Sequence, residues 1–324
     1  LPTVGKTSKA KMSIDNLTII NIQGIDTNYT RFDIDSRFSL MERLVAVHEP
    51  TILLLDDPYD GNLFKASIFQ KYETLTSDIN QNIVMLYDAN RVSATKQRDI
   101  RPKIKYLNFD NIVIPNVEVL SPQPMQEVIK RFVCLTWTGV NIYEEENKRK
   151  SYIEELISLS QAIAMTRNLP ILMGGDFKFP ISELKKLVNS RNQSAFSSLR
   201  EDTQPMFEQF GIGLASQVDY QLGRPKRLLT MKVHEIPRCN GTISKNDCFV
   251  ASQELRLRAP SFINIDELWS TAIYLHGEKE CNGGKPLSNQ TTMNGHCERP
   301  SPAQFCPTKT DIYVPQRPPR HHGG

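Results

Sequence analysis

Three features are missing from this chain of 324 residues, and each absence narrows what it is. Neither sign of charge is in large excess, because 39 basic residues face 36 acidic ones, so composition names neither a nucleic acid nor a membrane surface as partner. No apolar run reaches about 18 residues, so we expect no membrane span. No repeat period is present. With 39% hydrophobic residues, the chain has the composition of a globular protein that can bury a core.

Cysteine is scarce and unevenly placed. Cys134 lies in the apolar run RFVCLTW, which predicts a buried thiol. The other five lie in turn-rich sequence of the last third, where disulfides are easily accommodated; they are Cys239, Cys248, Cys281, Cys297 and Cys306. Cys239 and Cys248 bracket a segment with the pattern of a hairpin, which predicts a disulfide between them. The pairing of the last three stays open, and an odd cysteine is available for a bond between chains.

Potential glycosylation sites are more frequent than the roughly two or three that chance supplies. Five Asn-x-Ser/Thr sequons occur, at Asn16, Asn28, Asn192, Asn240 and Asn289. Together with the cysteines, they predict a secreted glycoprotein in an oxidising, extracellular setting. The start at Leu1 fits a processed precursor and fits a trimmed chain equally well.

Alternation of strands and helices predicts one α/β domain over residues 13–260, after an N-terminal segment of residues 1–12. Apolar runs predict strands at 17–22, 52–55, 82–88, 127–138, 171–173, 227–236 and 248–258. Helical spacing predicts helices at 36–49, 63–75, 144–167 and 182–188. Residues 261–324 are rich in Cys, Pro and Gly, which predicts an irregular extension that is disordered at its end.

Polar side chains stand at the ends of several predicted buried strands. In chain order they are Asn21, Asp57, Asp176 and Asp247. Carboxylates at strand ends around a cleft hold a hard cation such as Mg²⁺ and orient a water for attack on a phosphodiester.

The order of these residues resembles the endonuclease/exonuclease/phosphatase (DNase I-like) superfamily over about residues 13–258. NIQG at 21–24 matches the first family motif and places Asn21 at a metal and phosphate contact. PTILLLDD resembles the second motif, with Asp57 in place of the metal-binding Glu. GGDF at 174–177 resembles the most specific motif, with Asp176 retained and Lys178 replacing the Asn that contacts phosphate.

Two further motifs depart from the family at the positions that carry its chemistry. CLTWTG puts Trp137 where the family has His or Tyr, and an indole does not transfer protons. NDCFVASQEL resembles the last motif, with Asp247 retained and Cys248 replacing the His that binds phosphate and acts in proton transfer.

The resemblance implies a four-layer α/β sandwich, in which two packed mixed β-sheets are flanked by helices. The altered positions favour a catalytically inactive pseudoenzyme that serves as a binding or assembly scaffold, with no cofactor, and with self-association or an extracellular partner. One alternative is a divergent Mg²⁺-dependent endonuclease or phosphodiesterase that acts on nucleic acid, with Lys178 on the phosphate. The other is the relic of a retroelement-type endonuclease. Asn21, Asp57, Asp176, Lys178 and Asp247 are expected to converge at one mouth of the sandwich.

Overall fold

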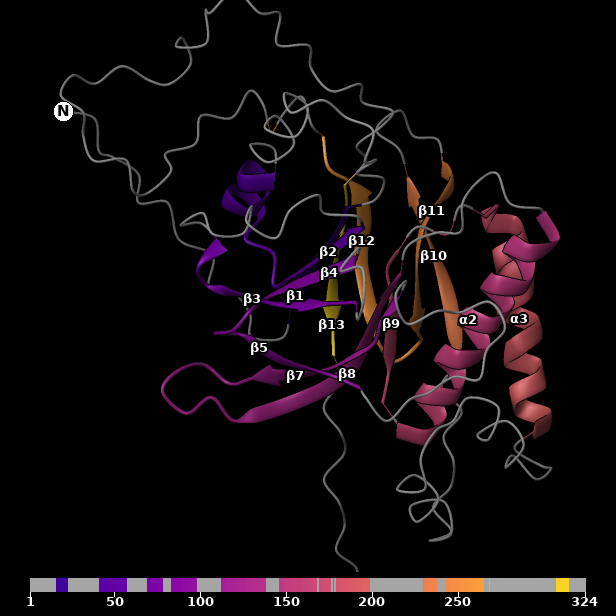
Figure 1. Cartoon of the computed structure of the whole chain (residues 1–324), viewed down its shortest axis with the longest axis horizontal. Coiled ribbons are helices and arrows are strands. Elements are labelled where there is room, and N and C mark those ends of the chain that lie inside the picture. The colour runs from indigo at the N-terminus through magenta and orange to yellow at the C-terminus, as the bar shows by residue number, and fades with distance from the viewer. Residues whose placement is uncertain are drawn as a thin grey trace, which may run out of the picture.

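The structure of the protein is a computed structural model, and it describes thirteen stretches of the chain. They are residues 16–22, 41–56, 69–77, 83–97, 112–137, 146–167, 169–175, 177, 179–198, 230–237, 243–264, 268 and 307–314. Within these stretches a few side chains, including those of Asp56 and Asp247, are not described. Two β-sheets packed face to face dominate the described part (Figure 1).

The first sheet has six strands in the spatial order β12-β13-β1-β2-β4-β3. β1 and β2 run parallel, and all other neighbours are antiparallel. The strands are β1 (Asn16–Ile22), β2 (Ile52–Asp56), β3 (Tyr72–Thr76), β4 (Ile83–Asp88), β12 (Arg256–Phe262) and β13 (Thr308–Tyr313).

The second sheet has seven strands, six of them in the order β10-β11-β9-β8-β7-β5, with β6 paired to β8. Only β8 and β9 run parallel. The strands are β5 (Val92–Lys96), β6 (Ile112–Val113), β7 (Pro115–Leu120), β8 (Val128–Trp137), β9 (Ile171–Met173), β10 (Met231–Pro237) and β11 (Ile243–Ser252).

Helices cover the outer face of each sheet and complete the four-layer α/β sandwich that the sequence predicts. α2 (Glu146–Arg167) connects β8 to β9, and α3 (Ile181–Ser198) follows β9; both lie outside the second sheet (Figure 1). Helical residues 41–48 pack on the outer face of the first sheet. Alternation along β1 divides the core, because Leu17 and Ile19 lie between the sheets whereas Ile20 and Ile22 lie under helix 41–48.

Two of the element predictions are wrong, one in the type of element and one in its extent. Residues 72–75, predicted as the end of a helix, belong to strand β3, because Thr74 and Thr76 pair with β4 and sheet pairing overrides local propensity. Residues 248–258, predicted as one strand, belong to β11 and β12, which lie in different sheets. A turn at 253–255 separates them, and no Gly or Pro marks it.

The predicted domain boundary at residue 260 also needs correction. β12 continues to Phe262, and β13 lies between β12 and β1 in the first sheet. The predicted C-terminal extension therefore contributes an interior strand to the sandwich. The sequence conceals this strand because two of its three buried positions are Thr308 and Thr310, so no apolar alternation is visible.

The strands β1, β2, β8 and β9 end at the same end of the sandwich, called here the mouth end. Gly174, directly after β9, lies so close to β2 that a Cβ there would be 2.8 Å from Leu54 Cδ1. Leu54 is in turn the register partner of Asn21 in β1. The opposite end, called here the far end, carries the β4–β5 connection and the β7–β8 hairpin.

Candidate ligand site at the mouth end

Asn21 is the one residue of the predicted convergent set whose side chain the structure describes. It is 2% exposed, and the alternation of β1 turns it toward the space between the sheets. Its backbone carbonyl accepts a hydrogen bond from Thr308 Oγ1 at 3.3 Å, but its side-chain Nδ2 has no hydrogen-bond partner. A buried donor without a partner costs about 1–3 kcal/mol. Asn21 therefore presents an N–H donor that a ligand or water would satisfy.

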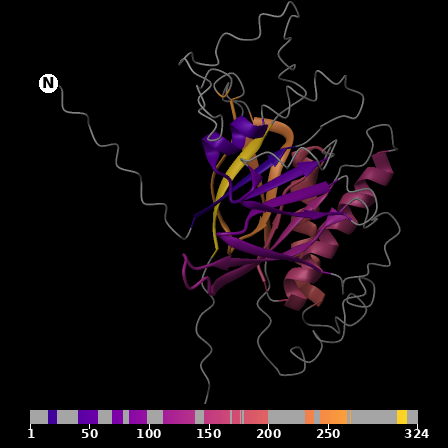
Figure 2. The same cartoon turned by 60° about the vertical axis from the view of Figure 1, so that its left-hand side comes forward.

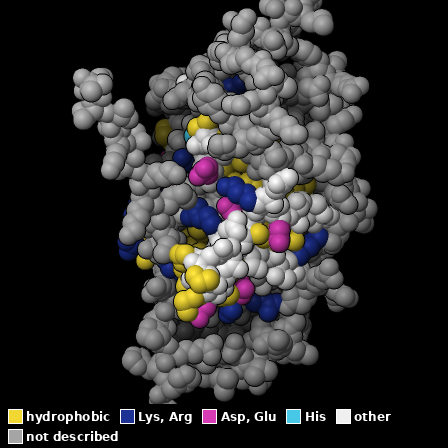
Figure 3. Space-filling model, turned by 90° about the vertical axis from the view of Figure 1, so that its left-hand side faces the viewer, with side chains coloured by type: hydrophobic (Ala, Val, Ile, Leu, Met, Phe, Trp, Pro, Cys, Tyr) yellow, Lys and Arg dark blue, Asp and Glu magenta, His cyan; other side chains and the backbone are white. Residues whose placement is uncertain are grey.

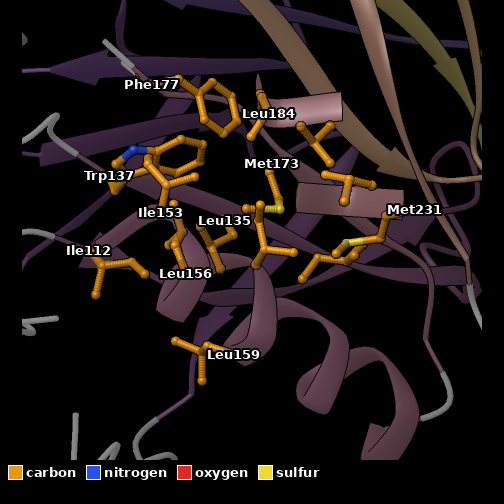
Figure 4. Packing of buried hydrophobic residues seen from close by; sticks show 14 of the residues in the cluster. Ile112, Leu135, Trp137, Ile153, Leu156, Leu159, Met173, Phe177, Leu184 and Met231 are labelled. Atoms are coloured by element: carbon orange, nitrogen blue, oxygen red, sulfur yellow. The ribbon is translucent and has the colours of Figure 1, made fainter. Parts of the chain in front are cut away.

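Trp137, the last residue of β8, is a core residue. Its side chain is fully buried on the helix side of the second sheet, and its ring lies edge-on to Phe177 with centroids 4.5 Å apart (Figure 4). A Cβ at Gly175 would be 2.8 Å from Trp137 Cδ2, so only glycine allows the indole to lie there. The space next to the Gly-Asp-Phe motif is therefore filled by an apolar ring.

Cys248 is also a core residue. It is 1% exposed and lies in the cluster between the second sheet and its helices, on the same side as Val250. The structure gives it as a thiol, so the predicted disulfide with Cys239 is wrong for this state of Cys248, while Cys239 itself lies outside the described residues. The predicted disulfide does not form because side chains alternate along β11, and this alternation points the side chain of Cys248 into the core.

The remaining predicted site residues are not placed. Asp57, Asp176 and Lys178 lie outside the described residues, and Asp247 is described only as part of the backbone of β11. Their convergence stays a prediction. Within the described stretches no three side chains of His, Cys, Asp or Glu come together as a metal site, and the nitrogen that Asn21 leaves without a partner is a donor, which suits an anion.

Three residues at the mouth end were not predicted from the sequence as candidate site residues. Gln97 follows β5, Arg149 lies in the first turns of α2, and His234 lies in edge strand β10 opposite Phe249. Each has a buried side-chain atom without a partner, namely Gln97 Oε1, Arg149 Nε and His234 Nε2. No spacing pattern in the sequence marks Gln97 or His234, because their burial depends on strands that are distant along the chain.

The electrostatics of His234 follow from its position. Burial, and secondly the charge of Lys232, lower the pKa of His234 to about 4, so the imidazole is neutral at pH 7. Cys134 shows the same effect of burial on a thiol: between the two sheets its pKa is raised to about 12, which confirms the predicted buried thiol. Neither group carries charge at neutral pH.

The sequon at Asn192 lies within α3, and its side-chain amide is fully used. Nδ2 donates to the Met231 carbonyl at 2.9 Å, while Oδ1 accepts from Met231 N at 3.1 Å and from Gln161 Nε2 at 3.0 Å. A glycan on Nδ2 would break the bond that ties α3 to β10. Asn16 begins β1 at the far end, and Asn28, Asn240 and Asn289 lie outside the described residues.

Comparison with solved structures finds the same architecture elsewhere. The chain is similar to the catalytic domain of human Nocturnin with bound sulfate, at 14% identity over 93% of this chain and 95% of that one, with a TM-score of 0.51. It is similar to an endonuclease/exonuclease/phosphatase family protein from Bacteroides thetaiotaomicron, at 8% identity over 93% and 99%, with a TM-score of 0.52. A mannosyl-6-phosphatase of the same bacterium gives 9% identity over 92% and 100%, with a TM-score of 0.51.

Sequence comparison adds nothing to this, because no protein-family model and no curated protein matches the chain. The described helices include none that is long and apolar enough to cross a membrane. The chain thus has the fold of endonuclease/exonuclease/phosphatase proteins, as the sequence motifs predict, and the likeness extends over nearly its whole length.

Proposed function

We propose that this protein is a binding protein on a phosphoesterase-type sandwich, which holds an oxyanion-bearing ligand at the mouth end without hydrolysing it. The observation that carries the proposal is the burial of Trp137 and Cys248 in the core on the helix side of the second sheet. These are the two positions where the resemblance implies proton-transfer groups. Side chains committed to an apolar core do not serve as general acid or base.

The energetic argument against hydrolysis is direct. Loss of a general acid or base alone costs about 10²- to 10⁴-fold in rate. An indole offers only an N–H donor, and Cys248 places a thiol in the core where the resemblance implies an imidazole. A Mg²⁺ ion at the mouth would depend on Asp57, Asp176 and Asp247, and it belongs to the alternative of a metal-dependent phosphodiesterase.

The argument for binding comes from the unsatisfied groups. Buried polar atoms are nearly always hydrogen-bonded in folded proteins, so each exception calls for a water, an ion or a ligand. Asn21 Nδ2 and Arg149 Nε are donors at the mouth end of the fold, and both have no partner. Of the two, Asn21 faces the space between the sheets and carries the proposed contact with an oxyanion, whereas Arg149 lies on α2, outside the second sheet.

The hydrolysis arm of the test uses plasmid DNA and a generic phosphodiester in Mg²⁺ and in Mn²⁺, with Asp247→Ala as control. We expect no turnover above the control. Turnover that both EDTA and Asp247→Ala abolish would overturn the proposal in favour of the metal-dependent phosphodiesterase.

The binding arm uses inorganic phosphate as the probe and thermal unfolding as the readout. Phosphate should raise the unfolding temperature of the wild-type chain, since a ligand that binds only the folded state stabilises it. Asn21→Leu should remove most of this increase, whereas Asn90→Leu at the far end should leave it unchanged. Equal responses of both variants would contradict a site at Asn21.

Secretion and assembly through the cysteine-bearing C-terminal region are further parts of the proposal. They depend on sequons and cysteines that lie outside the described residues. Expression through a secretory pathway, followed by glycopeptide mapping, tests them. Glycans are expected at sequons other than Asn192, and a non-reducing gel shows whether an odd cysteine joins two chains. A chain that carries no glycan at all would contradict secretion.

A further inference from the structure

The β7–β8 hairpin exposes apolar side chains at the far end of the sandwich. Three large hydrophobic side chains are well exposed in the described part of the chain, and two of them belong to this hairpin: Met125 at 69% and Val128 at 41%. Figure 3 faces this side of the molecule and shows apolar side chains gathered on it. Their concentration on one projecting element indicates a contact surface.

A pocket of about 390 Å³ adjoins the hairpin. Its lining includes apolar Leu17, Leu120 and Pro122. It also includes Asn90 and Gln123, whose side chains are joined by a hydrogen bond that Gln123 Nε2 donates to Asn90 Oδ1 at 3.4 Å. This volume falls at the lower end of the usual range of ligand pockets, about 300–1,000 Å³. Arg91 also lines the pocket but does not make it an anion site, because its Nη1 and Nη2 donate to Thr51 Oγ1 and the Asn16 carbonyl.

The last strand of the chain ends beside this pocket. Tyr313 of β13 is the register partner of Asn16, the neighbour of Leu17. Lys130 Nζ, at the base of the hairpin, lies 4.5 Å from the centroid of the Tyr313 ring. Figure 2 shows the lower end of β13, in yellow, next to the hairpin. Val314, which follows β13, is therefore close to the pocket, and ten residues follow it in the sequence.

The sequence of these residues, PQRPPRHHGG, suits this surface. Pro315, Pro318 and Pro319 favour polyproline II, whose backbone carbonyls make no internal hydrogen bonds and accept from side-chain amides such as those of Asn90 and Gln123. At about 3.1 Å per residue, residues 315–320 reach roughly 19 Å, enough to cross the pocket and follow the hairpin.

Charge favours the same contact. Burial lowers the pKa of Arg91, whereas Asp88, Glu49 and Asp311 lie close enough to Arg91 to raise it. Lys71 Nζ lies 3.5 Å from Asp88, so three carboxylates face two cations at this turn. Arg317 and Arg320 bring positive charge to this surface. Because the segment is tethered, its effective concentration is on the order of millimolar, and weak contacts suffice.

We propose that residues 315–324 fold back onto the far end of their own chain, with the Pro315–Arg320 stretch in the pocket and along the β7–β8 hairpin. This contact is independent of the proposed function, since it lies at the opposite end of the sandwich from Asn21. It covers the apolar hairpin and leaves the mouth end accessible.

Photocrosslinking in the full chain tests the proposal. A benzophenone amino acid replaces Gln316, two residues beyond Val314, and irradiation is followed by peptide mapping. The exposed Met125 side chain is a suitable target for the excited benzophenone to form a crosslink with. The matched control carries the same probe at Ile14, two residues before Asn16, because both probes then hang from the same end by equal tethers.

We expect crosslinks from position 316 to the hairpin, including Met125, at least about fivefold above those from position 14. The substitutions Pro318→Gly and Pro319→Gly together should reduce them severalfold without changing the unfolding temperature. Equal yields from both probes would show mere proximity and overturn the proposal. Crosslinks between two chains, dependent on protein concentration, would also overturn it and identify a second copy as the occupant.

Discussion

At the far end of the sandwich the charged groups around Arg91 have hydrogen-bond or ion-pair partners, whereas at the mouth end Asn21 leaves its buried Nδ2 without one. Arg91 donates to Thr51 and Asn16, and Asp88 accepts from Asn90 N at 3.0 Å and lies 3.5 Å from Lys71 Nζ. Buried side-chain atoms without a hydrogen-bond partner nevertheless occur at both ends of the described part. They are Asn21 Nδ2, Gln97 Oε1, Arg149 Nε and His234 Nε2 toward the mouth end, and His48 Nε2, Arg167 Nε and Glu254 Oε2 toward the far end, the last three in residues that make other interactions.

Buried polar groups that have hydrogen-bond partners and buried polar groups that lack them need different explanations. A satisfied network joins β1, β2 and β4 and is explained by stability alone, because each group replaces its water with a protein partner. Unsatisfied groups destabilise the fold and have no structural explanation. At the mouth end Asn21 faces the space between the sheets, whereas Trp137 and Cys248 lie in the core on the helix side of the second sheet. The mouth end thus combines a buried amide that lacks one hydrogen-bond partner with apolar core packing around Trp137 and Cys248.

Truncation of Trp137 should produce the largest effect. Trp137→Ala removes a fully buried ring in contact with Phe177, and we expect a loss of about 3–5 kcal/mol in the free energy of unfolding, measured by urea denaturation. Met125→Ala, at an exposed position, should cost less than about 0.5 kcal/mol. A small loss for Trp137→Ala would place the indole in an open cleft and remove the main argument against catalysis.

Substitution of Arg91, which bonds to Thr51 and Asn16 in what is called here the far-end network, should produce the second largest loss of stability. Arg91→Met leaves Thr51 Oγ1 and the Asn16 carbonyl without the guanidinium that donates to them, so unfolding should become easier by about 2–3 kcal/mol. Lys71→Met removes a half-exposed ion pair and should cost less than about 1 kcal/mol. Similar costs for the two substitutions would mean that the far-end network is not the structural element we describe.

His234 should make stability depend on pH. The unfolded chain takes up a proton near pH 6.5 and the folded protein only near pH 4, so the unfolded state binds more protons between these values. The free energy of unfolding should therefore be complete above about pH 6.5 and fall as the pH is lowered toward 4. Partial exposure limits the contribution to about 1–2 kcal/mol. Urea denaturation at pH 7 and pH 5 measures it, and His234→Gln should flatten the difference.

Asn21 should give the smallest change, and in the opposite direction. Asn21→Leu replaces an amide that has no partner for its Nδ2 by an apolar side chain of similar size, which should leave the free energy of unfolding unchanged or raise it by up to about 1 kcal/mol. The same urea series measures it, with Thr18→Val, which removes the bond to Asp311, as the destabilising reference. A loss above about 1 kcal/mol would show that the Asn21 amide has a partner in solution.

The local elements were largely predictable because they depend on near neighbours in the chain. The long helix at 144–167, the strand at 127–138 and the buried thiol of Cys134 match the structure closely, since apolar periodicity and β-branched runs report burial directly. The helix prediction for residues 72–75 was wrong because those residues take their conformation from pairing with β4. β13 was missed because its buried threonines carry no apolar pattern.

The candidate site was also predictable only in part from the sequence. Motif order alone singled out Asn21, Trp137 and Cys248 as positions that matter. It did not predict the direction in which Trp137 and Cys248 point, and the expected Cys239–Cys248 disulfide does not form at the buried Cys248. Gln97 and His234 carried no signal, because an isolated polar residue becomes buried only when distant strands pack around it.

By itself the sequence determined the order of strands and helices, the four-layer sandwich and the list of altered family positions, because periodicity and motif order are properties of the chain. Only the tertiary structure decided which face each side chain occupies, that β13 lies within the first sheet, and that the amide of Asn21 is buried with its Nδ2 without a hydrogen-bond partner. The physical reason is that burial and hydrogen-bond satisfaction are set by contacts between segments far apart in sequence.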